Sequence, residues 1–202
     1  MKLYYSPGAC SLSPHIVLLE TGLPFTTEKT DLQTKKTEKG VDFLTVNSKG
    51  SVPTLVLDDG SVLTEGPAIV QYIADQKPDS GLAPRAGTLE RYRLMEILNY
   101  LTSEVHKSFG PLFNPAATAD AKQAALDVVG KKFDWLSGHL GAKKFLLGEN
   151  FTVADAYLFT MLGWTRHVGI ELGKWPVLAA YEGRVGHRPK VQEALKAEGL
   201  IK

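Results

Sequence analysis

The chain has 202 residues, of which 44% are hydrophobic and 22% charged, and this composition is typical of a globular protein with one large domain or two small ones. Because 23 basic residues are balanced by 22 acidic ones, the net charge of +1 gives no sign of nucleic-acid binding or of a charged tail. The single cysteine excludes an internal disulfide, and no apolar run is long enough to span a membrane or to form the core of a signal peptide, so we expect a cytoplasmic protein.

The first part of the chain alternates strand and helix signals. Lys2–Tyr5 is typical of a short strand, and the next segment, Leu12–Thr21, is typical of a helix that Ser11 or Ser13 can cap. Phe25–Leu32 is a weaker strand prediction, because its alternating pattern contains few apolar residues. A strand, a helix and a second strand in this order favour a parallel pair joined by a right-handed crossover.

A β-hairpin and a helix follow. The segment TLVLDDGSVLT places two short strands, 54–57 and 61–64, around Asp59-Gly60, which is a strong tight-turn signal. The next segment, EGPAIVQYIADQ, predicts a helix over 65–76 with Pro67 in its first turn. The complete order predicts a four-stranded sheet with a thioredoxin-like layout, βαβ followed by ββα.

Everything beyond residue 88 has helical patterning. We therefore predict an α/β N-terminal thioredoxin-like domain over residues 1–77, a linker rich in Pro, Gly and Ser over 78–88, and an all-α domain over 89–202. In FTVADAYLFTML, Thr152 can cap a helix while Asp155 stands three residues further on, as in a capping box. The remaining predicted helices lie around 94–105, 121–140, 177–186 and 190–197.

Cys10 stands just before the first predicted helix. Unpaired N–H groups and the positive dipole at a helix N-terminus lower the pKa of a thiol below its free value of about 8.5, which predicts a reactive thiolate. The alternative is a small buried hydrophobic residue, which is the usual role of a free cysteine. Redox proteins of this layout carry Cys-x-x-Cys here, whereas this chain has Cys10-Ser11-Leu12-Ser13. Any exchange must therefore use an external thiol, and glutathione is the obvious small cytoplasmic one.

Two further segments suit a peptide-like thiol compound. In GSVPTL, a cis bond before Pro53 would face the cysteine and leave the backbone of Val52 free to pair with an extended peptide, although a trans proline at a strand start is commoner. In LTEGPAIV, the N–H of Gly66 could bind a carboxylate while Glu65 pairs with an ammonium, and the γ-glutamyl end of glutathione has both groups. The simpler alternative for Glu65 is an acidic residue that stabilises the helix dipole.

These features, in this order and with an all-helical second half, resemble the glutathione S-transferase family over nearly the whole chain. The cysteine in GACSL and the segment NYLTSEVHK at 99–107 look most like the bacterial beta class, which uses cysteine where other classes use tyrosine or serine. The resemblance implies a homodimeric detoxification enzyme that conjugates glutathione to small electrophiles and needs no other cofactor.

The resemblance also implies the site residues. Cys10 and His106 would be catalytic, and some of the glutathione contacts would cross the dimer interface. The implied glutathione contacts are Cys10, Lys35, Val52, Glu65, Gly66, Asn99, Ser103, Glu104, His106 and Lys107. One departure is that Gly66 replaces a serine found in many other transferases, so a hydroxyl contact is absent.

The residues alone say less about the second domain. Asn99, Ser103, His106 and Lys107 share one helical face, but a polar face opposite an apolar stripe is usually only solvated surface. His106 could supply a proton or a hydrogen bond to a reacting sulfur, since histidine titrates near neutral pH. His15 lies close to Cys10 and could tune the thiol, or it could simply pack.

Four aromatic residues of the second domain could line an apolar pocket for the electrophile, although aromatic residues at helical spacing are more often core. They are Phe109, Phe113, Trp164 and His167.

Two functions remain open from the sequence. The first is a glutathione transferase that also performs thiol–disulfide exchange through Cys10. The alternative is a non-catalytic glutathione or hydrophobic-ligand binding protein of the same fold, since fold does not fix function. Five scattered histidines and one cysteine offer no metal-ligand spacing.

Overall fold

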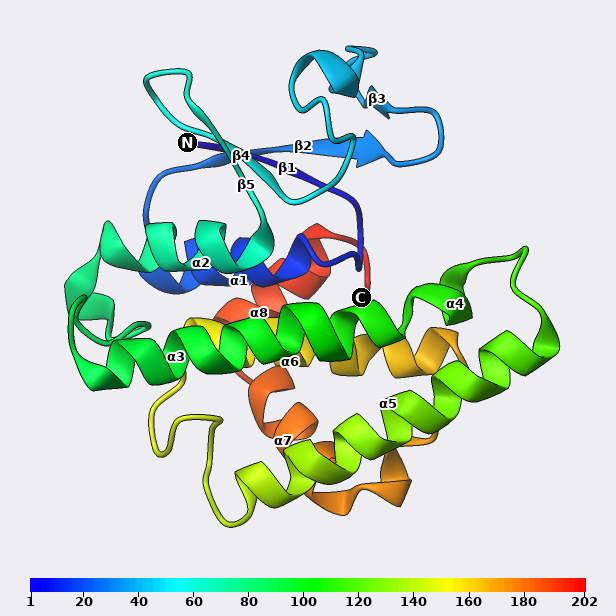
Figure 1. Cartoon of the computed structure of the whole chain (residues 1–202). Coiled ribbons are helices and arrows are strands. Elements are labelled where there is room, and N and C mark those ends of the chain that lie inside the picture. Colours follow the sequence, from blue (N-terminus) through cyan, green and yellow to red (C-terminus); the bar gives the residue numbers. More distant parts are fainter.

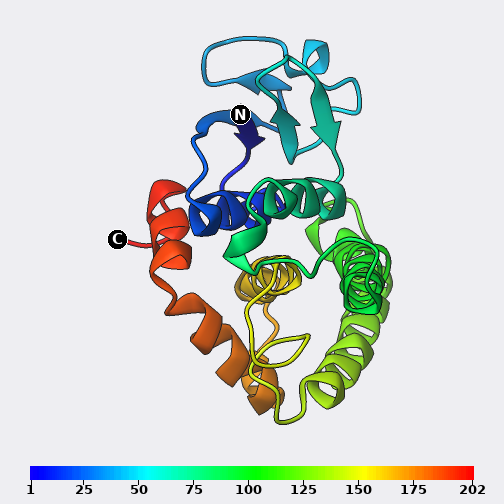
Figure 2. The same ribbon diagram turned by 90° about the vertical axis from the view of Figure 1, so that its left-hand side faces the viewer.

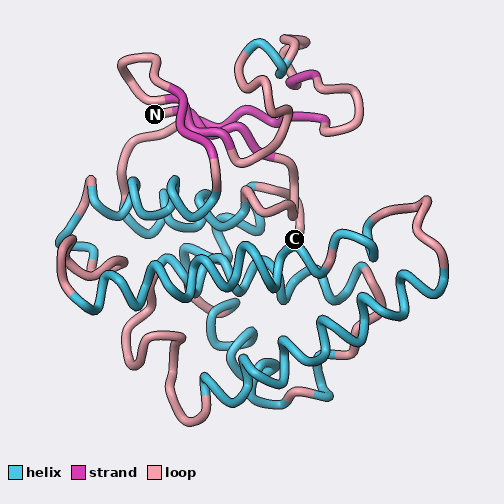
Figure 3. Tube along the Cα trace, in the orientation of Figure 1, coloured by secondary structure: helices cyan, strands magenta, loops and turns pink.

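The computed structural model of the chain describes residues 1–202 and has a strand-rich part above a larger helical part (Figure 1). All strands lie in the upper part, and helices fill the rest (Figure 3). The strands form one five-stranded sheet in the order β3-β2-β1-β4-β5. Their bounds are β1 Lys2–Tyr5, β2 Thr26–Asp31, β3 Lys36–Thr37, β4 Thr54–Val56 and β5 Val62–Thr64.

The sheet is mixed, as its predicted layout requires. β1 and β2 are parallel and are joined through α1, Leu12–Thr21, whereas β4 is antiparallel to β1 and forms a hairpin with β5. Gly60 in the hairpin turn has φ +85°, a conformation that glycine adopts without strain. The prediction missed β3, because a two-residue strand that pairs only with the end of β2 is too short to show a periodic pattern.

Ten-residue helices α1 and α2, Gly66–Asp75, lie side by side beneath the sheet, and α6, Val153–Trp164, runs beneath them (Figure 2). α1 packs against α2, α6 and α8, Pro189–Ala197, so the sheet and the helical part share one buried core. The remaining α-helices are α3 Leu89–Tyr100, α4 Gly110–Phe113, α5 Ala119–Leu140 and α7 Pro176–Gly186, with short 3₁₀ turns at Phe43–Thr45, Pro78–Ser80, Thr165–His167 and Leu172–Lys174.

The central helix α6 is buried on all sides except at Gly163, which explains why its sequence is apolar all round. Its start has the predicted capping box. The carboxylate of Asp155 accepts hydrogen bonds from the N–H and the hydroxyl of Thr152, both at 2.8 Å, and also binds the N–H of Leu146 and the hydroxyl of Tyr181. A buried carboxylate with four donors fixes the loop before α6 and the contact with α7.

The helix expected around 94–105 differs from the prediction in one respect. The α-helix ends at Tyr100, and residues Leu101–His106 continue it as a π-helical segment. Such widened turns are rare and frequently lie at functional sites, because the extra residue changes the direction of the side chains that follow. No helix of the chain combines the length and the apolar character that a membrane span needs.

Candidate functional site

The turn before Cys10 is held from both parts of the molecule. Gly8, with φ +71°, donates its N–H to Glu198 Oε2 at 2.8 Å, and its carbonyl accepts the Trp164 indole N–H at 2.8 Å. Ser11 ties the turn from within, because its hydroxyl bonds both the N–H and the carbonyl of Ser6. The sequence suggested that Ser11 or Ser13 caps α1, but α1 has no side-chain cap.

The thiol of Cys10 lies against the Val52-Pro53 step. This peptide bond is cis, as expected, and the thiol donates a hydrogen bond to the Val52 carbonyl at 3.1 Å. The N–H of Val52 has no partner within the chain. Cys10 therefore faces the Val52 backbone, whose N–H is free to donate a hydrogen bond to a ligand.

The pKa of Cys10 differs from the sequence prediction. Burial raises it to about 11, and the Glu65 carboxylate adds to the rise, whereas the N–H groups of Cys10 and Ser11 lower it. The expectation of a thiol pKa below the free value is therefore wrong for the unliganded chain. The helix N-terminus acts in the expected direction, but the loss of hydration around the sulfur is larger. At neutral pH Cys10 is a thiol that can donate a hydrogen bond.

A cavity of about 470 Å³ opens between the sheet and the helical part at Cys10. Seven of the ten glutathione-contact residues implied by the sequence line it: Cys10, Lys35, Val52, Glu65, Gly66, His106 and Lys107. The other lining residues are Ala9, Leu32, Asn47, Lys49, Gly50, Ser51, Pro53, Thr64, Thr102 and Tyr157. Three lysines and one glutamate give this lining a formal net charge of +2, which suits an anionic ligand.

The other three predicted contacts lie elsewhere. Asn99, Ser103 and Glu104 are exposed and do not line the cavity. The Ser103 hydroxyl bonds the Asn99 carbonyl at 2.8 Å, and Glu104 forms an ion pair with Lys132 at 2.6 Å. Within one chain, these residues belong to the outer surface of α3 and of the π-helical segment.

Glu65 and Gly66 begin α2 at one end of the cavity. Glu65 has φ +70°, an uncommon conformation for a residue with a side chain. Gly66 N–H has no partner within the chain, and Pro67 has no N–H to offer. Lys49 Nζ lies 2.7 Å from Glu65 Oε1 and 3.0 Å from Thr64 Oγ1. This end of the cavity thus presents a carboxylate, an ammonium and a free backbone donor.

His106 reaches the cavity from the end of the π-helical segment. Its Nδ1 lies 2.7 Å from the hydroxyl of Tyr157, which lies 3.0 Å from Thr102 Oγ1, and its ring packs against Trp164 with the centroids 4.7 Å apart. Burial, with a smaller effect from Lys107, lowers the pKa of His106 to about 4. Burial also raises the pKa of the Tyr157 hydroxyl. At neutral pH both groups are uncharged, so the His106 ring has one nitrogen that donates a hydrogen bond and one that accepts a hydrogen bond.

The structure does not bring the four aromatic residues suggested as an electrophile pocket to one cavity. Trp164 lies edge-on to Phe109 at 5.4 Å and to Phe113 at 5.7 Å. Phe109 is fully buried and belongs to the core, whereas Phe113 keeps about half of its surface exposed. Trp164 and His167 both line a cavity of about 530 Å³ between α1, α6, α7 and α8, which is separate from the one at Cys10.

Three polar residues that line the cavity carry no recognisable signal in the sequence. Tyr157 lies within the apolar pattern of α6, and Thr102 is brought to the cavity on the π-helical segment. Lys49 lies in a loop whose backbone is fixed by the buried Asn47, and no pattern marks either residue. All three depend on tertiary contacts that periodicity cannot show.

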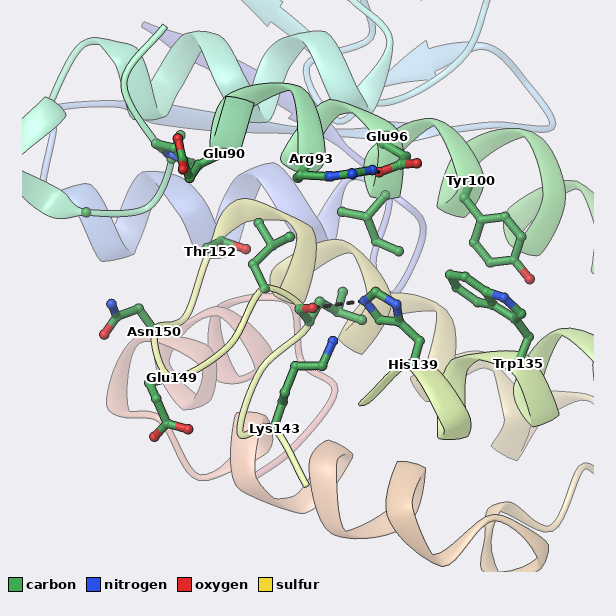
Figure 4. Close-up of a pocket in the computed structure, with 16 residues that line it drawn as sticks. Glu90, Arg93, Glu96, Tyr100, Trp135, His139, Lys143, Glu149, Asn150 and Thr152 are labelled. Atoms are coloured by element: carbon green, nitrogen blue, oxygen red, sulfur yellow. Dashed lines mark hydrogen bonds and ion pairs between the residues drawn. The ribbon is translucent and has the colours of Figure 1, made fainter. Parts of the chain in front are cut away.

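A larger cavity of about 900 Å³ lies between α3, the end of α5 and the segment before α6 (Figure 4). Tyr100, Trp135 and His139 form a row of rings on one wall, with centroids 4.4 Å and 5.0 Å apart. It contains no cysteine and none of the predicted site residues, so its volume does not identify it as the reaction site. The chain has no group of three or more side chains placed to hold a metal ion.

Comparisons with known proteins show the family of the chain. Two family models match, glutathione S-transferase N-terminal domain over residues 8–76 and glutathione S-transferase C-terminal domain over residues 119–184. The chain is 46% identical to glutathione S-transferase GstA of Escherichia coli O157:H7, over 99% of this chain and 100% of that protein.

Two solved structures are closer in sequence. A bacterial beta class glutathione S-transferase from Sphingomonas chungbukensis is 57% identical with a TM-score of 0.97, over 100% of both chains. A sphingomonad glutathione S-transferase complexed with glutathione is 54% identical with a TM-score of 0.96, also over 100% of both chains.

Proposed function

The chain belongs to the glutathione S-transferase family and is a glutathione S-transferase, and from that premise we propose that Cys10 adds glutathione-dependent thiol–disulfide exchange to conjugation. The observation that supports this most is the position of the only cysteine, which lies in the cavity beside Val52, Glu65 and Gly66. Glutathione is the co-substrate of the family, and the relative complexed with it has the same fold.

The free backbone groups indicate how glutathione lies in the cavity. It runs as an extended strand along Val52, whose N–H is free and whose carbonyl now accepts the Cys10 thiol. The γ-glutamyl carboxylate is placed at the free Gly66 N–H and the γ-glutamyl ammonium at Glu65. The net positive lining favours a ligand with two carboxylates and one ammonium, and favours its thiolate form more.

In conjugation, Cys10 acts as a hydrogen-bond donor. With a pKa raised to about 11 it remains a thiol at neutral pH, and its S–H can turn from the Val52 carbonyl to the glutathione thiolate. The thiolate then attacks the electrophilic carbon and expels its leaving group. His106, neutral at this pH, lines the same cavity and supplies a second hydrogen bond to the reacting sulfur.

In exchange, Cys10 acts as the nucleophile. Its proton passes to a solvent base, and the thiolate attacks the glutathione sulfur of a mixed disulfide between glutathione and a substrate thiol, forming a Cys10–glutathione disulfide and releasing the substrate sulfur as a thiolate. Ser13 stands where a resolving cysteine would be, so a second glutathione thiolate must break the Cys10–glutathione disulfide. That step releases glutathione disulfide and restores Cys10.

We base the assignment of the domains and of the dimer contacts on the same family. We assign residues 1–77 to a glutathione-binding domain, 78–88 to a linker, and 89–202 to a helical domain that supplies the electrophile pocket and the contacts of a homodimer. Asn99, Ser103 and Glu104, which lie outside the cavity of their own chain, would reach the glutathione of the partner subunit. Two exposed apolar residues on α3, Leu89 at 66% and Tyr92 at 60%, support an interface there. A lone unpaired cysteine fits the bacterial cytoplasm.

The replacement Cys10→Ala tests the two roles. We expect it to abolish thiol–disulfide exchange, because that route requires the cysteine sulfur, and to reduce conjugation of a generic electrophile less. Incubation with glutathione disulfide should increase the intact mass of the wild-type chain by one glutathionyl group and leave the variant unchanged. Equal loss of both activities would contradict the proposal, as would retention of glutathione without turnover of any electrophile.

A further inference from the structure

Lys49 forms an ion pair with Glu65 across the mouth of the cavity. Its ammonium lies 2.7 Å from Glu65 Oε1 and 3.0 Å from the hydroxyl of Thr64. Glu65 is the only acidic residue in the lining of this cavity. In the unliganded chain, the carboxylate best placed to receive an ammonium is therefore already paired with one.

The backbone of Lys49 is held firmly, whereas its ion pair is exchangeable. The buried amide of Asn47 accepts the Lys49 N–H at 3.1 Å and donates to the Ser51 carbonyl at 2.9 Å, which fixes the loop. By contrast, the Lys49 and Glu65 side chains are 56% and 70% exposed. Ion pairs exposed to this degree are weak, so a ligand can replace either partner at little cost.

The other two lysines of the cavity have different roles. Lys35 Nζ donates to the Gly50 carbonyl at 2.8 Å, at the end of the loop that carries Lys49. Lys107 follows His106 at the end of the π-helical segment, in the helical part of the molecule. Only Lys49 is placed next to both Glu65 and the start of α2.

We propose that Lys49 is a further glutathione-binding residue, which releases Glu65 when glutathione enters and then binds the α-carboxylate of the γ-glutamyl end. This inference rests on the proposed binding of that end at Glu65 and Gly66. The arriving ammonium takes the place of the Lys49 ammonium on Glu65, and the carboxylate one carbon away offers Lys49 a new partner. Each charge keeps an opposite partner throughout, so the zwitterionic end of the ligand is recognised by a matching pair of side chains.

Two glutathione analogues separate the two charges. γ-Aminobutyryl-cysteinyl-glycine lacks only the α-carboxylate, and glutaryl-cysteinyl-glycine lacks only the α-ammonium. Dissociation constants for glutathione and both analogues are measured by titration calorimetry at low salt, for the wild-type chain and for Lys49→Met. The penalty for losing each charge is the ratio of the analogue's dissociation constant to that of glutathione.

In Lys49→Met we expect the penalty for losing the carboxylate to fall about fivefold, the size of an exposed charge contact, while the penalty for losing the ammonium stays within about twofold. Lys49→Arg should restore the wild-type carboxylate penalty. Lys36→Met is the matched control, because Lys36 is exposed nearby but does not line the cavity, and it should leave both penalties unchanged.

Unchanged penalties in Lys49→Met would overturn the proposal, and so would an equal fall of both penalties, which would indicate a general effect on the cavity. An unchanged thermal midpoint shows that the variant is folded, as the exposure of Lys49 leads us to expect. Failure of the wild-type chain to bind glutathione would overturn the proposed function itself. This outcome is distinct from failure of the Lys49 proposal, because it is seen without any change at residue 49.

Discussion

The carboxylate of Glu198 accepts the backbone N–H of Gly8 at 2.8 Å, although the two residues lie 190 positions apart. The other oxygen of the same carboxylate lies 2.9 Å from His15 Nδ1, and both side chains are almost fully buried. The last helical turn of the chain therefore fixes the turn that carries Cys10, and His15 is part of that support rather than of the cavity lining.

We expect Glu198→Ala to lower the free energy of unfolding by about 2–4 kcal/mol, because it leaves the Gly8 N–H and the His15 ring without their buried partner. Chemical denaturation measures this loss. Glu193→Gln, which removes an exposed ion pair with Lys190 on the same helix, should change stability by less than about 0.5 kcal/mol. Equal effects of the two variants would show that Glu198 does not support the Cys10 turn.

The raised pKa of Cys10 predicts slow alkylation of the unliganded chain. With a pKa of about 11, the rate with iodoacetamide should keep rising up to that pH, and at neutral pH it should be far below that of a free thiol. Because the folded pKa lies above that of a free thiol, the thiol favours folding below the free-thiol pKa, and this contribution is lost as the pH rises to about 11.

The measurement is a pH profile of the alkylation rate followed by intact mass. Since Cys10 is the only cysteine, no other thiol contributes to the signal. A rate that already reaches its plateau near neutral pH would show that the helix N-terminus outweighs burial after all.

The hydrogen bond between Tyr157 and His106 predicts a role for a residue that the sequence did not indicate. Tyr157→Phe removes the 2.7 Å contact that orients the imidazole, and we expect kcat for conjugation to fall up to about tenfold, the value of one hydrogen bond. KM for glutathione should change little. Tyr72→Phe, which removes a hydroxyl on α2 outside the cavity lining, is the control and should leave kcat unaffected.

Burial of the His106 ring determines how its protonation depends on pH. Its pKa is lowered from 6.5 to about 4, so the neutral ring favours folding above pH 6.5, and this contribution is lost as the pH falls from 6.5 toward 4. We therefore expect the pH profile of the conjugation rate to contain no transition near pH 6.5 that is caused by His106. A His106→Asn variant is the reference, because a transition caused by His106 would be present in the wild-type profile and absent from that of the variant. Such a transition would mean that His106 titrates as an exposed histidine.

Local signals in the sequence were sufficient for most of the fold. Gly22 ends α1 and Gly60 forms the hairpin turn, both with positive φ, and Thr152 with Asp155 starts α6. These features depend on residues close together in the chain, so turn chemistry and capping predict them. β3 was missed because a two-residue strand carries no periodic pattern.

The site was less predictable, because burial and distant contacts determine it. The dipole argument for Cys10 had the correct sign, but it could not include the desolvation that raises the pKa. Lys49 and Tyr157 reach the cavity only through a loop and a central helix that meet in the folded chain. The family resemblance placed Glu65 and Gly66 at one end of the cavity, whereas spacing alone also allowed a simple helix cap.

Gly66 itself allows a gain of function. A Cβ at this position would lie 3.9 Å from Pro53 Cγ and 4.0 Å from Tyr157 Cζ, which is ordinary contact distance, so Gly66→Ser should fit without displacement. We expect the added hydroxyl to donate to the γ-glutamyl carboxylate and to tighten glutathione binding about three- to tenfold. Gly66→Ala adds the same Cβ and the same helix stabilisation without a donor, so titration calorimetry should give it the wild-type affinity. If serine and alanine bind glutathione equally well, the carboxylate does not lie at the start of α2.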